Sequence, residues 1–547
     1  MAVVPRVPAA PPPAPPPAPP PPPTVEAAGA FAGYPVGAPL VTERVGAGPR
    51  QVPWDECFDA AGRVRPVYRR LVSAIASLTP QELAAKAEGL ELSMRAQGIT
   101  FTVHSGGEAG AGAADTERTF PLDLLPRLLD AVEWEQVSAG LVQRVTALNA
   151  FVADIYGSRE VLADRILPTG LVVTGRHFTR QATGLAVPQS IWTHISGPDL
   201  VRHPDGRWLV LEDNCRTPSG VSYVLENRAS MVRGFPELFA RHRVRPVDAY
   251  PAALLDVLRS IAPRGDSDPT IVVLTPGSYN SAYFEHTFLA RQMGVEIVEG
   301  GDLFVDDAVV WMKTTRGRRR VDVVYRRVDD DYLDPLDFRP DSVLGTTGLL
   351  TAARAGNVAI ANAIGTGIAD DKAVFAYVPE LIRYYLGEEP VLDQVPTHLC
   401  SEPESLEHVL AHLPEMVVKA VSESGGYGMT IGPYASDAEL ADCRRRLLAK
   451  PRAYIAQDVV GLSTHPTLVP GPGGAPALRP RHVDLRPFVL MGAEAVTVIP
   501  GGLTRAALPE GSLVVNSSQG GGSKDTWVVD PDLPGSGGDL QGAGSRR

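Results

Sequence analysis

The sequence is poor in several features that mark common classes of protein. Only four cysteines occur in 547 residues, and they show neither CxxC spacing nor the density of a disulfide framework. No run of about 18 apolar residues is present, and no charged segment followed by an apolar one opens the chain. These absences argue against a secreted or membrane-spanning protein and favour a reducing, cytoplasmic location.

Basic clusters are also scarce. The formal net charge is −12 and the sequence pI is about 5.5, whereas a nucleic-acid-binding surface needs clustered lysine and arginine. The one basic run of note, Arg316 to Arg320, lies between two strand-like segments at 309–312 and 321–325. It is read as a charged hairpin tip rather than as a phosphate site. We therefore expect neither a nucleic-acid nor a membrane partner.

Several catalytic signatures are missing. The chain has no GxGxxG fingerprint for a dinucleotide, no GKS or GKT of a Walker A loop, and no GxSxG or Cys/His pattern for a covalent nucleophile. What remains is an ordinary globular composition, with 44% hydrophobic and 21% charged residues. A chain of this length is expected to fold into two to four domains or lobes.

Composition and periodicity give a first outline of these parts. Residues 1–50 are rich in proline and alanine, and we expect an extended tail without a core. Residues 51–165 are predicted to be mainly helical, with one helix capped by Thr79-Pro80-Gln81-Glu82 and another within 122–157. Residues 265–365 read as a strand, helix, strand module that begins with the apolar run at 271–274. The fold class is therefore α/β.

The most informative segment spans residues 199–228, DLVRHPDGRWLVLEDNCRTPSGVSYVLENR. Two apolar runs flank a turn-forming His-Pro-Asp-Gly-Arg sequence, so the segment is predicted to form a β-hairpin. With the turn over 204–207, His203 faces Trp208, and Asp199 falls opposite Glu212. Side chains alternate along a strand, which places Asn214 on the same face as Glu212.

Two opposed carboxylates repel each other, so this hairpin needs a compensating positive charge. A divalent cation is the simplest answer, because Mg²⁺ is held by one or two carboxylates while phosphates and water complete its shell. A solvated polar hairpin end is the alternative for any single acidic residue. The three oxygen donors together, followed by Arg216, favour the metal site.

A second group of residues is suited to phosphates. Lys419 lies on a predicted strand that enters the glycine-rich loop Ser424 to Gly428, where bare backbone N–H groups can contact phosphate oxygens. The same loop can be a plain hairpin turn. Other candidates are Lys372 at a helix start, Gln457 beside an adenine edge, and Arg486 and Arg505 as phosphate clamps, although surface or strand-end positions explain each as well. His194 and His286 are acid/base candidates or structural histidines.

Four motifs together are similar to the circularly permuted ATP-grasp family of the second type. They are LEDNCRTPSGVSYVLENR, VLTPGSYNSAYFEH, KAVSESGGYG and VVNSSQGGGSKDTWV, and the resemblance covers about residues 50–530. The hairpin triad also resembles the metal site of glutathionylspermidine synthetase, a related ligase. In ordinary ATP-grasp order the lysine lobe precedes the metal lobe, whereas here the metal ligands come first, as a permutation requires.

The resemblance implies ATP and Mg²⁺ as cofactors and a role for each candidate residue. Mg²⁺ would be held by Asp199, Glu212 and Asn214. ATP would contact Lys372, Lys419, Gly425, Gly426, Gly428 and Gln457, and Arg216 or Arg505 would steady the transferred phosphoryl group. The implied domains are a metal-binding lobe at 166–264 that resumes at 461–529, a pre-ATP-grasp-like module at 265–365, an ATP-binding lobe at 366–460, and a C-terminal tail at 530–547.

The function that follows is an ATP-dependent carboxylate–amine ligase acting through an acyl phosphate. Its expected substrates are small-molecule or peptide carboxylates and amines. Two alternatives stay open: an ATP-binding scaffold that has lost turnover and acts with partner proteins, and a kinase without an amine step. The sequence names neither the acid nor the amine.

Overall fold

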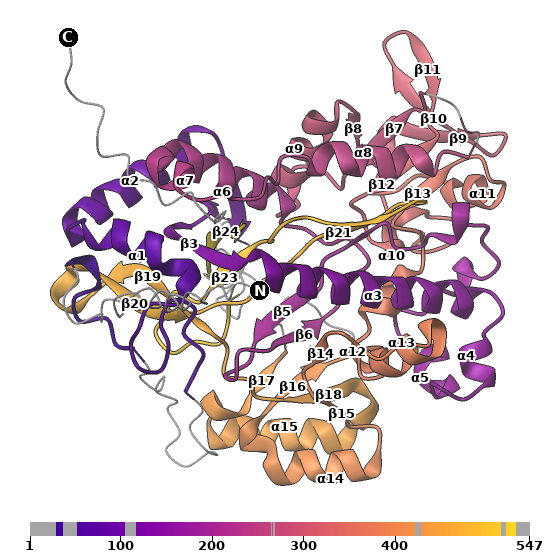
Figure 1. Cartoon of the computed structure of the whole chain (residues 1–547). Helices are drawn as coiled ribbons and strands as arrows, with labels where there is room; N and C mark the ends of the chain where they lie inside the picture. Colours follow the sequence, from indigo (N-terminus) through magenta and orange to yellow (C-terminus); the bar gives the residue numbers. More distant parts are fainter. Residues whose placement is uncertain are drawn as a thin grey trace, which may run out of the picture.

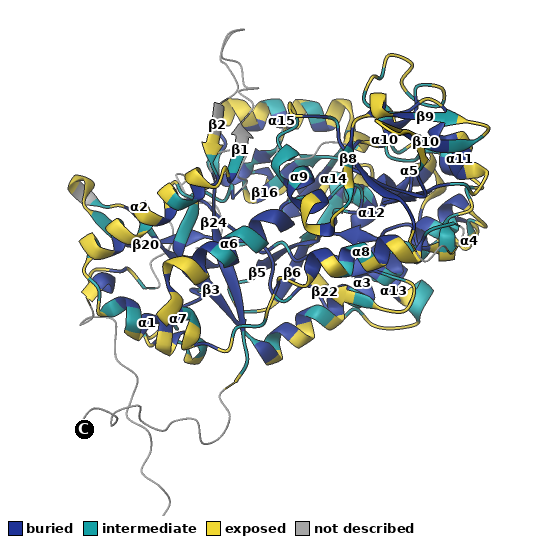
Figure 2. Cartoon of the chain, turned by 90° about the horizontal axis from the view of Figure 1, so that it is seen from above, coloured by how far each residue is buried: buried dark blue, intermediate teal, exposed yellow. Residues whose placement is uncertain are grey.

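The computed structural model describes residues 29–36, 52–103, 116–263, 265, 268–421, 428–515 and 521–531. The chain is a mixed α/β protein whose strands form several small sheets of two to four strands (Figure 1). The strands lie inside and are largely buried, while the helices cover them with their exposed faces outward (Figure 2). In the described residues no helix is long and apolar enough to cross a membrane.

Three helices organise the N-terminal region, α1 (Arg69–Ala76), α2 (Pro80–Ala96) and α3 (Ala131–Tyr156). The predicted cap of α2 is present, because the side chain of Thr79 accepts from the backbone of Glu82 while the Glu82 carboxylate accepts from the backbone of Thr79. Helix α3 crosses the middle of the molecule (Figure 1). Beside α2 lies a short hairpin of β1 (Thr100–Val103) and β2 (Thr116–Thr119).

The helix predicted within 122–157 begins later than expected. Residues Leu122–Asp130 form strand β3, which pairs in parallel with β24 (Gly522–Val529), and the helix starts only at Ala131. Strand β3 is at the edge of its sheet, where Pro126 removes no ladder hydrogen bond, and the register shifts at this proline. The apolar residues of PRLLD thus lie in a buried strand rather than in a helix.

Part of the proposed N-terminal tail is folded, which corrects our expectation for residues 1–50. Residues 29–36 are described and contain a short 3-10 turn, Gly29–Phe31. Phe31 is 1% exposed and its ring packs edge to face against Phe58, and Tyr34 donates a hydrogen bond to Asp55. The proline run ends at residue 23, and these two aromatic side chains supply the apolar surface that the run lacks.

The predicted α/β module is present. Its parallel sheet has the order β13-β12-β7-β8, with β7 (Ile271–Leu274), β8 (Glu296–Val298), β12 (Val323–Arg326) and β13 (Ala359–Ala361). Helices α8 (Tyr250–Ser260) and α9 (Tyr283–Met293) pack beside it. The basic run forms a hairpin of β10 (Val309–Thr314) and β11 (Gly317–Arg320), and its exposed arginines pair with Asp306 and Glu296, as the hairpin-tip reading predicts. Strand β9 (Leu303–Asp306) completes that sheet.

A separate antiparallel sheet lies at the bottom of Figure 1. Its order is β15-β18-β16-β17, with β15 (Thr397–Leu399), β16 (Met416–Ala420), β17 (Thr430–Ile431) and β18 (Tyr454–Asp458). Helices α14 (Pro403–His412) and α15 (Asp437–Ala449) cover its outer face and share a hydrophobic cluster with it. Its inner face is turned toward the rest of the chain.

The central hairpin pairs Asp199 with Glu212 as predicted, but the register near the turn differs from the predicted one. Strands β5 (Asp199–Arg202) and β6 (Trp208–Glu212) are antiparallel, and Arg202 rather than His203 lies opposite Trp208. This register would place Asp199 opposite Leu211. A one-residue irregularity between Asp199 and Leu200 shifts the pairing back, so that Asp199 faces Glu212. Strand β14 (Asp393–Gln394) extends this sheet in parallel with β6.

The late part of the chain returns to the hairpin. Strand β21 (Val489–Met491) pairs with β22 (Val496–Val498) and with β4 (Ile195–Ser196). The remaining strands are β19 (Thr464–Pro470), β20 (Pro476–His482) and β23 (Thr504–Ala506). The remaining helices are α4 (Glu160–Ala163), α5 (Thr169–Val173), α6 (Val221–Gly234), α7 (Pro236–Ala240), α10 (Asp330–Leu333), α11 (Leu349–Arg354), α12 (Lys372–Phe375) and α13 (Val378–Leu386).

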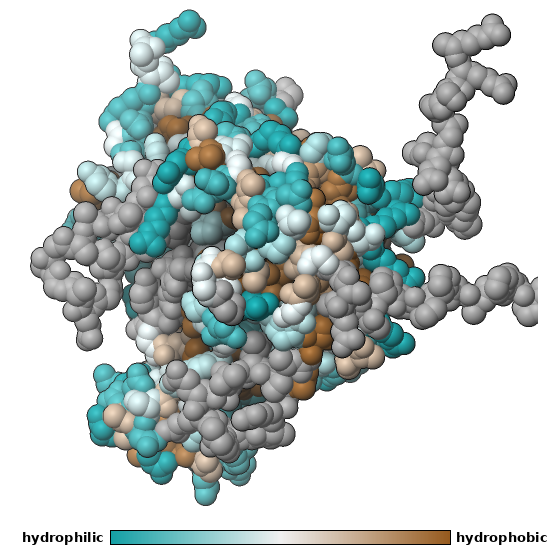
Figure 3. All heavy atoms as spheres, turned by 90° about the vertical axis from the view of Figure 1, so that its left-hand side faces the viewer, coloured by the Kyte–Doolittle hydropathy of each residue, from teal (hydrophilic) through white to brown (hydrophobic). Residues whose placement is uncertain are grey.

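On the side shown in Figure 3, hydrophilic surface alternates with small hydrophobic areas wherever the surface is not covered by grey atoms.

Candidate functional site

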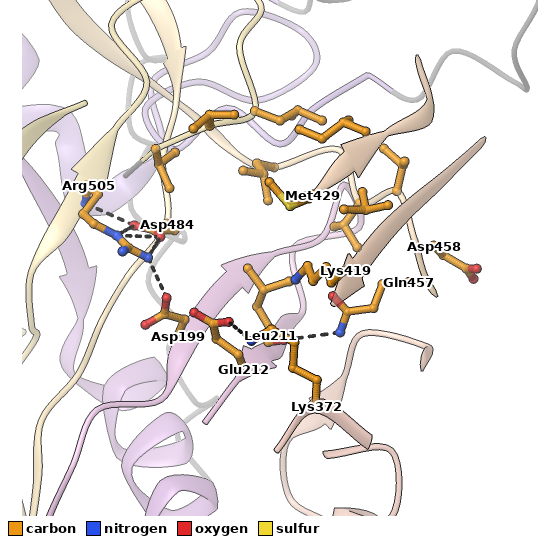
Figure 4. A pocket seen from close by; sticks show the side chains of 18 of the residues that line it. Asp199, Leu211, Glu212, Lys372, Lys419, Met429, Gln457, Asp458, Asp484 and Arg505 are labelled. Atoms are coloured by element: carbon orange, nitrogen blue, oxygen red, sulfur yellow. Dashed lines mark hydrogen bonds and ion pairs between the residues drawn. The ribbon is translucent and has the colours of Figure 1, made fainter. Parts of the chain in front are cut away.

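One pocket gathers residues from distant parts of the chain. It lies between the central hairpin, the inner face of the β15-β18-β16-β17 sheet and the late segments around 484, 505 and 513–515. Figure 4 shows carboxylates, lysines and an arginine around this space, among them Glu212, Lys419 and Arg505. The polar lining residues are Asp199, Glu212, Lys372, Lys419, Gln457, Asp458, Asp484 and Arg505. Six of these eight were predicted from the sequence as site residues.

Two lysines approach the pocket from different elements. Lys372 is the first residue of α12, whose N-terminus is capped by the Asp371 carboxylate, and its Nζ lies 3.9 Å from a Glu212 carboxylate oxygen. Lys419 lies on β16. Burial lowers the pKa of Lys419 and the charge of Lys372 adds to this, while Glu212 opposes it. Two ammonium groups held this close to one cavity suit an anionic ligand that neutralises both.

Asp199 faces the pocket but is already paired. Its carboxylate accepts from Arg486 at 2.5 and 2.8 Å and from Arg505 at 2.6 Å. Burial alone would raise the pKa of Asp199, but the two guanidinium groups outweigh it and hold the pKa well below the usual range. The positive charge that the sequence requires for the opposed carboxylates is thus supplied here by arginine and lysine side chains.

The other end of the pocket is apolar with one amide. Its walls include Leu211, Val417, Met429, Ile431, Val459, Val460, Leu462 and Leu513 to Val515. Gln457, on β18, is 2% exposed; its Nε2 donates to the hydroxyl of Thr397 at 3.0 Å, while its buried Oε1 has no hydrogen-bond partner among the described residues. An apolar slot with one unused acceptor suits a flat heterocycle that carries an amino group.

Other predicted residues lie outside the pocket lining. Arg216 is paired with Asp329 at 3.0 Å and with Asp370 at 2.8 Å, and Asn214 donates from Nδ2 to the carbonyl of Gly197 at 3.0 Å. Gly425 and Gly426 fall outside the described residues. Gly428 is described, has a φ of +68°, and lines a neighbouring depression with Met429. His194 and His286 are buried away from the pocket, and His286 shares a hydrogen bond with Thr275.

Comparison with known families identifies the chain. Residues 126–507 match the family model described as circularly permuted ATP-grasp type 2. The matched range includes every predicted site residue and most of the pocket. The chain belongs to the circularly permuted ATP-grasp type 2 family.

The relatives of this ATP-grasp chain extend the match. An uncharacterised protein of Mycobacterium tuberculosis is 53% identical over 478 residues, which cover 87% of this chain and 84% of the relative. A Frankia alni protein provisionally named glutamate–cysteine ligase 2-3 is 46% identical over 494 residues, covering 90% of this chain but 55% of the relative. The solved structure of a glutathione synthetase-like effector from Globodera pallida has the same fold, with a TM-score of 0.55, 13% identity, and 83% and 98% of the two chains covered.

The donor set of the ATP-grasp pocket fits Mg²⁺. Among the described residues no group of three or more His, Cys, Asp or Glu could hold a metal ion by itself. Asp199 and Glu212 line the pocket and Asn214 lies two residues beyond Glu212, outside the lining; two facing carboxylates with a nearby amide are a different kind of set, in which substrate phosphates and water supply the other ligands. Nδ2 of Asn214 donates a hydrogen bond to the carbonyl of Gly197, so the Oδ1 atom of the same amide is the one that would bind the metal.

Sequence reasoning missed three contributions to the site. Asp484 is fully buried against Arg505; Arg486 is a partner of Asp199, although the sequence suggested it as a phosphate clamp or a surface charge; and residues 513–515 close the apolar wall. The signal for Asp484 and Arg486 was the run His-Val-Asp-Leu-Arg, in which charged residues alternate with buried aliphatic ones in a strand-like segment. No local pattern marks residues 513–515, because they reach the pocket through tertiary folding alone.

Proposed function

We propose that this ATP-grasp protein is an ATP- and Mg²⁺-dependent carboxylate–amine ligase that forms an amide through an acyl phosphate. The observation that carries the proposal is the shared pocket. Carboxylates from 199–212, lysines from 372 and 419 and an arginine from 505 converge on one cavity whose far end is apolar. This is the division of charge that a nucleotide with its cation requires.

Each group has a distinct task in the proposed reaction. Lys372 and Lys419 would neutralise phosphate oxygens, and the Gln457 amide would face the adenine amino group. Asp199, Glu212 and Asn214 would hold Mg²⁺, which when bound offsets the charge of the transferred phosphoryl group. Arg505 approaches the same space and would contact the γ-phosphate, whereas Arg216, engaged with Asp329 and Asp370, is a candidate for orienting the acid.

The bonds change in two steps. A carboxylate oxygen of the acid attacks the γ-phosphorus, the bond to the β-γ bridging oxygen breaks, and ADP leaves. The amine nitrogen then attacks the acyl carbon, inorganic phosphate leaves with the C–O bond electrons, and the nitrogen loses a proton to give the amide. No protein nucleophile takes part, in agreement with the absence of such a motif in the sequence.

The relative from Frankia alni gives a first choice of substrates. The name of that protein specifies glutamate and cysteine, but this chain matches only 55% of its length, so the name alone does not carry the proposal. The test is ADP release from purified protein with Mg·ATP, a panel of amino acids and peptides as acids, and a panel of amines. Ligation predicts that ADP release needs both partners and that an amide appears in equal amount.

The alternatives give different products. A kinase would release a stable phosphorylated acid without any amine, and a scaffold would bind Mg·ATP with no turnover across the panels. Mass spectrometry of the reaction mixture separates the three outcomes. A stable acyl phosphate as final product, or binding without turnover across both panels, would overturn the ligase assignment.

A further inference from the structure

Four charged side chains form an alternating chain at the inner wall of the pocket. Arg486 contacts Asp199, Asp199 contacts Arg505, and Arg505 contacts Asp484. Both carboxylates are almost fully buried, at 1% and 0% exposure. Figure 4 shows Arg505 between the two carboxylates, with Asp199 on the side of Glu212. The four residues come from two regions of the chain nearly 300 positions apart.

The two arginines are held unequally. Arg505 is bound by Asp484 at three points, through the backbone N–H at 3.2 Å, through Nε at 2.9 Å and through Nη2. In the described part of the chain the side-chain hydrogen bonds and ion pair of Arg486 all go to Asp199, and its side chain is more exposed, at 16%. Arg505 would keep a partner if Asp199 turned away, and Arg486 would lose its carboxylate.

This inequality matters because the proposed function gives Asp199 a second task. Three arginine hydrogen bonds occupy three of the about four lone-pair sites of the Asp199 carboxylate, and two guanidinium charges lie where a divalent cation would approach it. Cation binding must therefore compete with the arginines. A permanent partner for Arg505 weakens its hold on Asp199, since the guanidinium charge is already largely balanced.

We propose that Asp484 is a positioning residue that anchors Arg505 at the nucleotide pocket, so that Asp199 exchanges Arg486 for Mg²⁺ while Arg505 stays in place. This inference rests on the proposed function. It assigns roles to Asp484 and Arg486, to which the proposed function gives no task. Asp484 favours metal binding by keeping Arg505 occupied, and Arg486 is the counter-ion of the metal-free site.

The two residues have opposite effects on the metal requirement. We expect Asp484→Asn to raise the Mg²⁺ concentration for half-maximal nucleotide binding about tenfold, because Arg505 then loses its buried carboxylate at Asp484 and holds Asp199 more strongly. Arg486→Met should lower that concentration about threefold, because it removes a competitor for Asp199. The measurement is a Mg²⁺ titration of a fluorescent ATP analogue on the full chain, followed by its anisotropy.

A second titration separates anchoring from a simple loss of charge. Asp525→Asn is the matched control, because Asp525 is also a buried aspartate paired with an arginine, Arg228 at 2.9 Å, but does not line the pocket. The Mg²⁺ concentration for half-maximal nucleotide binding should be the same in this variant as in the wild type. In a chain that already carries Arg505→Met, adding Asp484→Asn should hardly change the Mg²⁺ midpoint if Asp484 acts by anchoring Arg505. If Asp484 acts only through its charge at long range, the Mg²⁺ midpoint should still change.

The outcomes distinguish failure of this inference from failure of the proposed function. If the wild-type chain shows no Mg²⁺-dependent nucleotide binding, the proposed function fails. If it binds, but Arg486→Met leaves the midpoint unchanged or raises it, the exchange is wrong even where Asp484→Asn fails to fold. Equal effects of Asp484→Asn with and without Arg505 would remove the anchoring role.

Discussion

Asp199 lies directly opposite Glu212 across the β5–β6 hairpin, although the register nearer the turn would have paired it with Leu211. A strand irregularity of one residue restores the pairing at the end of the hairpin that borders the pocket. Irregularities of this kind redirect side chains beside functional sites. The neighbouring Asp213 is fixed by a buried bidentate contact with Arg144 on α3, which anchors the end of the strand.

Replacement of Glu212 by glutamine tests the task of this pair. The change keeps the size of the side chain but removes its charge, and the proposed metal site then has a single carboxylate. We expect Mg²⁺-dependent ADP release to fall by at least about 100-fold, with little change in the unfolding midpoint because Glu212 is only half-buried. Steady-state ADP release and thermal unfolding measure the two effects. Wild-type turnover would exclude the hairpin from the mechanism.

Lys419→Ala tests the phosphate side of the pocket. The ammonium group points into the cavity, and in the described residues it makes no ion pair within 4 Å, so its removal breaks no ion pair of the free protein. We expect the Kd for Mg·ATP to rise about tenfold or more. The control is Lys450→Ala, an exposed lysine just after α15 of the same lobe. Equal nucleotide affinity in both variants, measured by calorimetry, would contradict the placement of the phosphates.

Part of the fold, including the hairpin of the site, was predictable because the sequence patterns that indicate it are local. The hairpin was indicated by a turn sequence and two apolar runs, the α2 cap by Thr79 and Glu82, and the parallel sheet by the apolar run at 271–274. Even here the local pattern gave the right carboxylate pair from the wrong register. The turn sequence alone could not reveal the irregularity, which depends on how the strand packs.

The rest depends on contacts between distant parts of the chain. PRLLD has the spacing of a helix, but the strand at 522–529 pairs with it, and only this partner decides its conformation. Arg505 and Arg486 each had two interpretations in the sequence, as phosphate clamps or as surface charges. Their contacts with Asp199 distinguish these interpretations, and the partner lies 306 and 287 positions away in the sequence, beyond the reach of a local pattern.

Gln457 offers a test of base recognition. Its buried Oε1 has no partner in the described residues and can accept a hydrogen bond from the amino group of adenine, whereas guanine presents a carbonyl oxygen at the same position. We expect Gln457→Ala to weaken ATP binding about tenfold and to reduce the preference for ATP over GTP. Competition of the two nucleotides against a fluorescent ATP analogue measures both. An unchanged ratio of affinities would show that the base lies elsewhere.

His177 gives the chain a pH dependence that can be isolated. Burial lowers its pKa to about 4, and the nearby Arg216 charge adds to the effect. The folded chain thus keeps this imidazole neutral, so the stability it contributes is complete above pH 6.5 and is lost as the pH falls toward 4. Relative to His177→Gln, the wild-type free energy of unfolding should fall by about 2 kcal/mol between pH 7 and pH 4.5, after allowance for partial exposure. Urea unfolding at the two pH values measures this difference, with His412→Gln, at an exposed position, as the control. A difference between wild type and His177→Gln that is the same at both pH values would show that His177 is free to take up a proton in the folded chain.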